Sequence, residues 1–167
     1  PEDADPDNTD SGLSIEGCSE DETTLLALSQ DAPVVFVHRA TDVRLSGFTI
    51  DGGRRALLIW DGATVDLDFV AVKNSARIGI LFGGWETIVA ASHLAVEDTQ
   101  IEVDDFGVEY GYGIAIQEAT VTLTDSSVSG SHRVGILVDG APATLERVLV
   151  DGTTPATDGS LGRGIQI

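Results

Sequence analysis

An acidic insertion and a histidine–arginine pair contain the residues of this chain that are best suited to chemistry. The segment 97–112 reads "EDTQIEVDDFGVEYGY" and is followed, after the next strands, by His132 and Arg133. Two carboxyl groups about 5–9 Å apart can cleave a glycosidic bond, and a histidine can act as a general acid or base. We therefore take Asp104, Asp105, His132 and Arg133 as candidate catalytic residues.

The carboxylates of this insertion also allow two other interpretations. Calcium takes about six to eight oxygen ligands, and the carboxylates available here are Asp98, Glu102, Asp104, Asp105 and Glu109. Their spacing does not match an EF-hand loop or a glycine-rich nonapeptide array. A solvated acidic loop with its aromatic side chains folded down is the alternative.

A column of arginines and four aromatic residues forms a second candidate region. Arg54, Arg77 and Arg133 occupy the same position of a repeated segment, and guanidinium groups bind carboxylates and sulfates with two hydrogen bonds. Local pairing with Asp51, Glu97 or Asp151 is the alternative. Aromatic rings on both flanks could stack against sugars or protein partners. The predicted ligand-binding set is Arg54, Arg77, Arg133, Trp60, Trp85, Tyr110 and Tyr112. For His38 and His93 we expect structural roles.

The elements that must position these residues are short strands that recur along the chain. Apolar residues two apart, typical of strands with one buried face, occur at 57–59, 80–82, 114–116, 136–138 and 165–167. A second series begins at Val43, Val65, Val89, Val121 and Ala143, separated by 22, 24, 32 and 22 residues. A third series occupies 48–50, 70–72, 94–96, 126–128 and 148–150. This pattern predicts an all-β parallel solenoid of five to six coils, with three short strands per 22–24-residue coil.

The repeated Gly-Ile-x-Ile, Val-x-Leu and Asp-Gly segments resemble the right-handed parallel β-helix of the pectate-lyase-like superfamily. The resemblance covers residues 34–167, and the opening "SGLSIEGCSEDETTLL" resembles the first coil of secreted bacterial β-helix proteins. It implies a right-handed single-stranded parallel β-helix and an extracellular, cell-surface or periplasmic location in a bacterium. It also implies that the loop after the third strand builds any substrate cleft. The Arg-x-Pro-x-x-Arg signature of pectate lyases and the motifs of polygalacturonases are absent.

Composition bounds the domain and its partners. The formal charge of −19 disfavours nucleic acid, and no apolar run reaches the ~20 residues that span a bilayer. We expect an acidic, disordered linker at 1–12 and one β domain at 13–167, continuing beyond Ile167 because the last coil stops after its first strand. The single cysteine, Cys18, is interpreted as a small buried residue.

These patterns predict a secreted or cell-surface binding module without catalysis, with glycans as a ligand class. One alternative is a polysaccharide lyase or hydrolase that uses the predicted cleft. The other is a scaffold that docks through the apolar outward positions of the first strands, Leu58, Leu81 and Leu137, against a partner.

Overall fold

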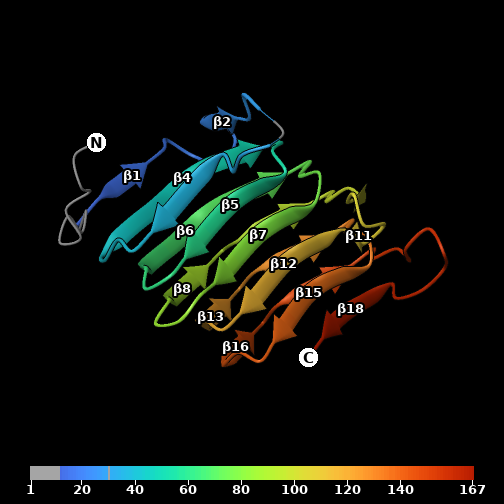
Figure 1. Ribbon diagram of the computed structural model, residues 1–167. Coiled ribbons are helices and arrows are strands. Elements are labelled where there is room, and N and C mark those ends of the chain that lie inside the picture. Colours follow the sequence, from blue (N-terminus) through green and yellow to red (C-terminus); the bar gives the residue numbers. More distant parts are fainter. Residues whose placement is uncertain (1–11, 30) are drawn as a thin grey trace, which may run out of the picture.

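Strands one repeat apart in the sequence lie side by side in the structure. The computed structural model describes residues 12–29 and 31–167, and its strands stack in order from the N-terminal to the C-terminal end (Figure 1). Pairing is parallel: Val43 lies beside Val65, which lies beside Val89, which lies beside Val121. The predicted register between repeats is confirmed.

The strands form two parallel sheets and one small ribbon. Sheet A contains β1 (Ser14–Glu16), β2 (Thr24–Leu26), β4 (Val43–Asp51), β6 (Thr64–Lys73), β8 (Ile88–Ser92), β9 (Ala95–Glu97), β13 (Thr120–Thr124), β14 (Ser127–Ser129), β16 (Ala143–Glu146) and β17 (Leu149–Asp151). Sheet B contains β3 (Val35–His38), β5 (Arg55–Trp60), β7 (Ile78–Gly83), β12 (Tyr112–Gln117), β15 (Val134–Asp139) and β18 (Arg163–Gln166). The ribbon pairs β10 (Glu102–Val103) with β11 (Glu109–Tyr110) in antiparallel fashion.

The prediction of a single-stranded β-helix with three separate short strands per coil is therefore wrong. The described residues form a ten-stranded and a six-stranded parallel sheet, and the predicted second and third strands belong to the same sheet A. In β4 and β6 these two strands run on as one. The corner between the two strands is a single left-handed residue in every coil, such as Gly47 and Phe69 (φ 67° and 51°) or His93 (φ 51°), so both strands stay in one sheet. In β4 and β6 the residues on both sides of this corner also keep pairing with the neighbouring strand.

The core lies between the two sheets and is built from the inward positions of both. Alternating apolar residues place one face of each strand inside. The largest fully buried side chains are Phe48, Phe82, Leu45, Ile50, Leu57, Ile59, Leu67, Ile80, Leu94, Ile114, Ile116 and Leu123. Gly113 lies where the two sheets approach each other closely, since a Cβ there would meet Val128 Cγ1 at 2.4 Å and the Gly135 carbonyl oxygen at 2.7 Å.

The outward apolar column of sheet B is covered largely by its own neighbours. Leu58, Leu81, Ala115 and Leu137 pair in register across β5, β7, β12 and β15. Leu81 is 7% exposed and Ala115 is 1% exposed, because they cluster with Ile78 and are packed by Trp60 and Tyr112. The predicted partner surface is thus closed at its centre by side chains of this chain.

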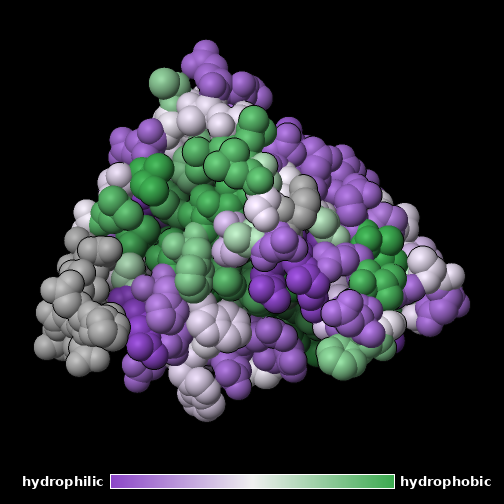
Figure 2. Space-filling view, turned by 45° about the horizontal axis from the view of Figure 1, so that its top comes forward, coloured by the Kyte–Doolittle hydropathy of each residue, from purple (hydrophilic) through white to green (hydrophobic). Residues whose placement is uncertain are grey.

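Apolar side chains are open to solvent at the end of the molecule formed by the first strands (Figure 2). Leu13, Ile15 and Phe36 are each more than one-third exposed and line a cavity of about 180 Å³. None of the described residues forms a helix with the length and apolar character needed to cross a membrane.

The predicted linker falls almost entirely outside the described residues, which exclude 1–11. Gly12, the last residue assigned to the linker, donates its N–H to the Thr41 carbonyl oxygen at 3.0 Å and so belongs to the β structure. The predicted insertion at 97–112 is present as the loop that carries β10 and β11.

Candidate binding site

A groove runs across the outer face of sheet A. It has a volume of about 470 Å³. The surface is hollowed here because β8 contributes the short side chains of Ala90, Ala91 and Ser92 to the groove. The residues that line it are Glu16, Arg44, Ser46, Asp66, Leu67, Asp68, Ala90, Ala91, Ser92, Thr122 and Thr124. Most of these are hydroxyl or carboxylate side chains, so the groove offers many hydrogen-bond acceptors.

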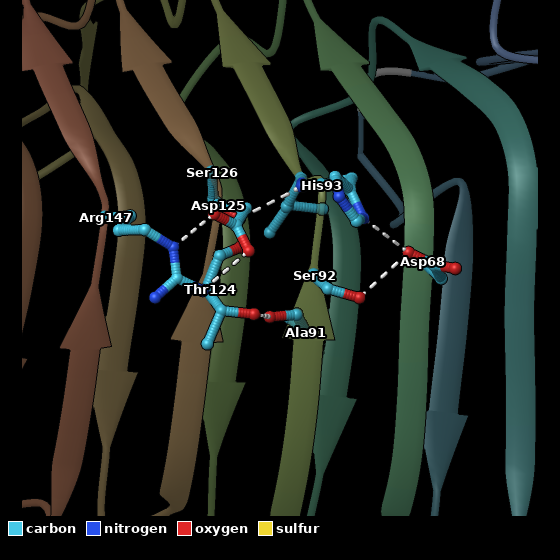
Figure 3. Close-up of polar contacts among 9 residues, drawn as sticks. Asp68, Ala91, Ser92, His93, Thr124, Asp125, Ser126 and Arg147 are labelled. Atoms are coloured by element: carbon cyan, nitrogen blue, oxygen red, sulfur yellow. Dashed lines mark hydrogen bonds and ion pairs between the residues drawn. The ribbon is translucent and has the colours of Figure 1, made fainter.

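Asp68 organises the polar contacts of this groove. Its Oδ1 atom accepts a hydrogen bond from Ser92 Oγ at 2.8 Å and lies 2.9 Å from His93 Nδ1. Figure 3 shows both side chains reaching Asp68 from the next strand along sheet A. The hydrogen bond with His93 lowers the pKa of Asp68, and bonding from Ser92 adds to this against the opposing effect of burial. Asp68 is therefore held as a charged carboxylate.

Phe69 and His93 stack at the corner beside the groove. Their rings are 4.3 Å apart and almost parallel, and both residues have a left-handed backbone with φ 51°. Such a conformation is costly for a bulky residue. In the successive coils the same position holds Asp125 and Arg147, also left-handed, where the Arg147 guanidinium binds the Asp125 carboxylate with two hydrogen bonds (Figure 3).

A second hollow of about 410 Å³ shares Ser46 and Asp68 with the groove and extends to Phe69 and Cys18. Cys18 is exposed, so its interpretation as a buried residue is wrong. Phe69 is 46% exposed and offers an apolar face beside the carboxylate of Asp68. Together the two hollows present acceptors and one aromatic ring to solvent.

The predicted catalytic residues are not assembled into one centre. Asp104 Oδ1 accepts hydrogen bonds from the N–H groups of Phe106 and Val108 at 3.0 and 2.8 Å, which lower its pKa together with Tyr110. Asp104 therefore shapes its own loop. Asp105 is exposed, and His132 Nδ1 lies 2.8 Å from Thr154 Oγ1. No hydrogen bond or ion pair among the described residues joins either aspartate to His132 or Arg133.

The carboxylates proposed for calcium are likewise separated. Glu102 forms an ion pair with Arg54 at 2.6 Å, Glu109 bonds with Thr157, and Asp98 is exposed at a corner. Within residues 12–29 and 31–167, no group of three or more His, Cys, Asp or Glu side chains is close enough to hold a metal ion. We place no metal site in this loop.

The predicted ligand-binding residues are brought together in part. Tyr110 and Tyr112 contact each other edge to face, with ring centres 6.0 Å apart. The guanidinium of Arg77 lies over the Tyr110 ring at 3.3 Å and that of Arg133 lies over the Tyr112 ring at 5.8 Å. The tryptophans do not complete this arrangement.

The two tryptophans lie at the other end of the sheet B strands. Trp60 packs across Gly83, where a Cβ would come within 2.0 Å of its ring. Trp85 follows in the next turn and is 74% exposed. Within the part of the chain that the structure describes, neither ring pairs with another aromatic ring, so the predicted frame of two Trp and two Tyr is not formed.

The sequence interpretation missed Asp68 and assigned His93 a structural role. One signal was available: Asp68 and Ser92 are 24 residues apart, one period of the repeat. The three residues meet because parallel pairing places Asp68 directly beside Ser92.

No protein-family model matches this sequence, and no curated protein or solved structure gives a significant match to it.

Proposed function

We propose that this domain is a non-catalytic binding module that holds an uncharged, polyhydroxylated ligand, such as a segment of a neutral oligosaccharide, in the groove of sheet A. The observation that carries this proposal is the lining of the groove around Asp68. Sugar hydroxyls donate to carboxylates, exchange hydrogen bonds with Ser and Thr, and stack their apolar faces on aromatic rings. The groove supplies the carboxylates and hydroxyls, and Phe69 of the adjoining hollow supplies the aromatic ring.

The charge of the groove selects against acidic ligands. Glu16, Asp66 and Asp68 contribute carboxylates, and the one guanidinium, that of Arg44, lies 3.8 Å from Asp66 and is matched by it. An acidic sugar placed here would meet like charges across a few ångströms. The ligand that fits is neutral, or carries an amine.

The contacts in the groove favour binding over catalysis. A serine nucleophile must give its proton to the histidine, whereas Ser92 donates to Asp68, the same oxygen that His93 contacts. A general acid for glycoside hydrolysis needs a raised pKa, whereas the pKa of Asp68 is lowered. The polysaccharide-cleaving alternative therefore has less support. We also keep a location outside the cell as part of the proposal, because glycans of this kind are accessible there.

The test is a titration of the 15N-labelled protein with neutral oligosaccharides of glucose, xylose, mannose and galactose, followed by calorimetry of those that bind. We expect saturable shifts at residues 44–46, 66–69, 90–93 and 122–124. Asp68→Asn should weaken binding about 10-fold or more, since a hydrogen bond to a charged group contributes roughly 1.5–3 kcal/mol.

Asp139→Asn is the matched control, because Asp139 is an exposed aspartate at the end of a sheet B strand. This variant should bind as the parent does. Failure of every sugar to bind, or equal binding by the Asp68 and Asp139 variants, would overturn the proposal.

A further inference from the structure

Four of the nine cationic side chains differ from the rest in having no acidic partner within residues 12–29 and 31–167. Five are paired at 4.0 Å or less: Arg39 with Asp61, Arg44 with Asp66, Arg54 with Glu102, Lys73 with Glu97 and Arg147 with Asp125. The others are Arg55, Arg77, Arg133 and Arg163, for which no carboxylate among the described residues lies within this distance. In a protein with a charge of −19, this is unexpected.

All four lie where the strands of sheet B begin, and we call them the arginine edge. Arg55 and Arg163 are the first residues of β5 and β18, while Arg77 and Arg133 directly precede β7 and β15. Backbone bonds link them from coil to coil: the N–H of Arg77 donates to the Arg54 carbonyl oxygen, and that of Arg163 donates to the Arg133 carbonyl oxygen. The backbone positions of Arg77 and Arg163 are therefore fixed by hydrogen bonds to the preceding coil.

The arginine edge carries an electrostatic cost. The Nε atoms of Arg55, Arg77 and Arg133 are buried without a hydrogen-bond partner among the described residues, as is that of the neighbouring Arg54. The pKa of Arg55 is lowered, first by burial and then by the charges of Arg77 and Arg54. A buried donor without an acceptor and a charge beside like charges are both unfavourable. A bound oxyanion would relieve the repulsion between the charges.

The insertion packs against the arginine edge and brings acids near it without an ion pair at 4.0 Å or less to its four arginines. Tyr110 and Tyr112 lie against the guanidiniums of Arg77 and Arg133. Glu102 forms its ion pair with Arg54, and Asp104, whose pKa is lowered in small part by the charge of Arg77, bonds with its own loop. The coil between Arg77 and Arg133 contributes Gly111, which has no side chain and lies against His132.

We propose that the arginine edge is a second binding site, for the carboxylate or sulfate group of an acidic ligand, with Arg77 and Arg133 as its main contacts. Guanidinium groups bind such oxyanions with paired, charge-assisted hydrogen bonds. Tyr110 packs against the first of these guanidiniums and Tyr112 against the second. This site is separate from the groove on sheet A. The groove takes a neutral ligand, whereas the arginine edge selects a negatively charged one.

The test uses the arginine Nε–Hε signals of the 15N-labelled full chain. Two probes of matched size are titrated at constant ionic strength: oligogalacturonate, which carries carboxylates, and a sulfated galactan oligomer. Neutral galactan oligomer is the blank. We expect saturable shifts of the Arg77 and Arg133 signals with one or both acidic probes. Arg77→Gln and Arg133→Gln should each weaken binding about 10-fold or more.

Arg39→Gln is the matched control, because it removes the same charge from an arginine that is already paired with Asp61. It should leave affinity for the acidic probes unchanged. The proposal is overturned if the acidic probes shift no arginine-edge signal, or if Arg39→Gln weakens binding as much as Arg77→Gln, which would indicate only long-range attraction. Binding of one acidic probe and not the other identifies the oxyanion. Asp68→Asn should have no effect, which separates this site from the groove.

Discussion

The corner of sheet A and the arginine edge of sheet B are both columns of residues stacked one repeat apart, yet they treat charge in opposite ways. At the corner, Asp125 pairs with Arg147, which is 22 residues later, and nearby Asp68 pairs with His93, which is 25 residues later. At the arginine edge, Arg55 and Arg77 are 22 residues apart and have the same charge. Stacking places residues of successive coils next to each other regardless of their type. When successive coils carry side chains of opposite charge, they form ion pairs within the column. When successive coils carry the same charge, the partner has to come from outside the column.

The polar groups at the corner are paired within the stack, whereas those at the arginine edge are left to bind other groups. Where each coil supplies the partner of the previous coil, the polar groups stabilise the stack. Where it does not, the chain has added an insertion whose acids and rings reach back to sheet B. The insertion orients the guanidiniums and neutralises only Arg54.

The largest expected effect comes from disturbing the close approach of the sheets on which both columns depend. Gly113→Ala should destabilise the fold by about 1–3 kcal/mol, because the new Cβ would overlap Val128 and the Gly135 backbone. Urea denaturation measures this. Gly164→Ala occupies the same position in the last coil, where the nearest atom is 3.6 Å away, and should change stability by less than about 0.5 kcal/mol. Equal effects would contradict the account of the core.

A second prediction converts the corner into a like-charge column. Asp125→Arg would place a guanidinium beside that of Arg147 in place of a carboxylate. We expect the melting temperature to fall by a few degrees at low salt and to recover part of this in high salt, because exposed charges are screened. Asp125→Asn removes the ion pair without adding repulsion. Its melting temperature should fall less and should depend less on salt. If both variants behave alike, charge alternation at the corner is unimportant.

A third prediction concerns the pH dependence of the groove. Because the folded-state pKa of Asp68 is lowered, chiefly by His93, its contribution to stability is present above the ordinary aspartate pKa and is lost as pH falls below about 4. The carboxyl carbon of Asp68, followed by NMR, should titrate at lower pH than that of a free aspartate. His93→Ala should move this titration upward. An unchanged midpoint in the variant would show that His93 is not the cause.

The smallest expected effect tests the cost of the arginine edge without ligand. Arg55→Gln should raise the melting temperature at low salt by about 1–2 °C, since it removes a partly buried charge next to Arg77 and Arg54. Arg39→Gln changes the net charge equally but breaks the pair with Asp61, and should lower it slightly. A lower melting temperature in both variants would mean that the arginine edge carries no net repulsion.

Much of the strand arrangement could be predicted, whereas the number of sheets could not. The pairing of Val65 with Val89 and of Val89 with Val121 follows from the apolar alternation, because a shift by one residue would turn every buried side chain outward. The second and third strands of each coil are joined by a single left-handed residue, such as Phe69 or His93, and remain in one sheet. Sequence alternation contains no signal for whether such a corner starts a new sheet.

The candidate sites were predicted less well for a related reason. The structure brings Arg77 against Tyr110 and Arg133 against Tyr112, because Arg77, Tyr112 and Arg133 lie where the neighbouring strands β7, β12 and β15 begin. Their role in binding a ligand stays a prediction. The catalytic grouping of Asp104 with His132 was not confirmed, because Asp104 turns inward to cap its own loop. The direction of a loop side chain depends on local hydrogen bonds that spacing alone does not reveal.

The amino-acid sequence by itself determined the repeat, the register of the strands and the residues that stack in each column, because only one register buries every apolar position. The tertiary structure decided how each column is completed. It placed His93 against Asp68, closed the outer face of sheet B with Trp60 and Tyr112, and folded the insertion over the arginine edge. These contacts join residues from different coils at corners and loops, where side-chain direction is set by packing and not by the repeat.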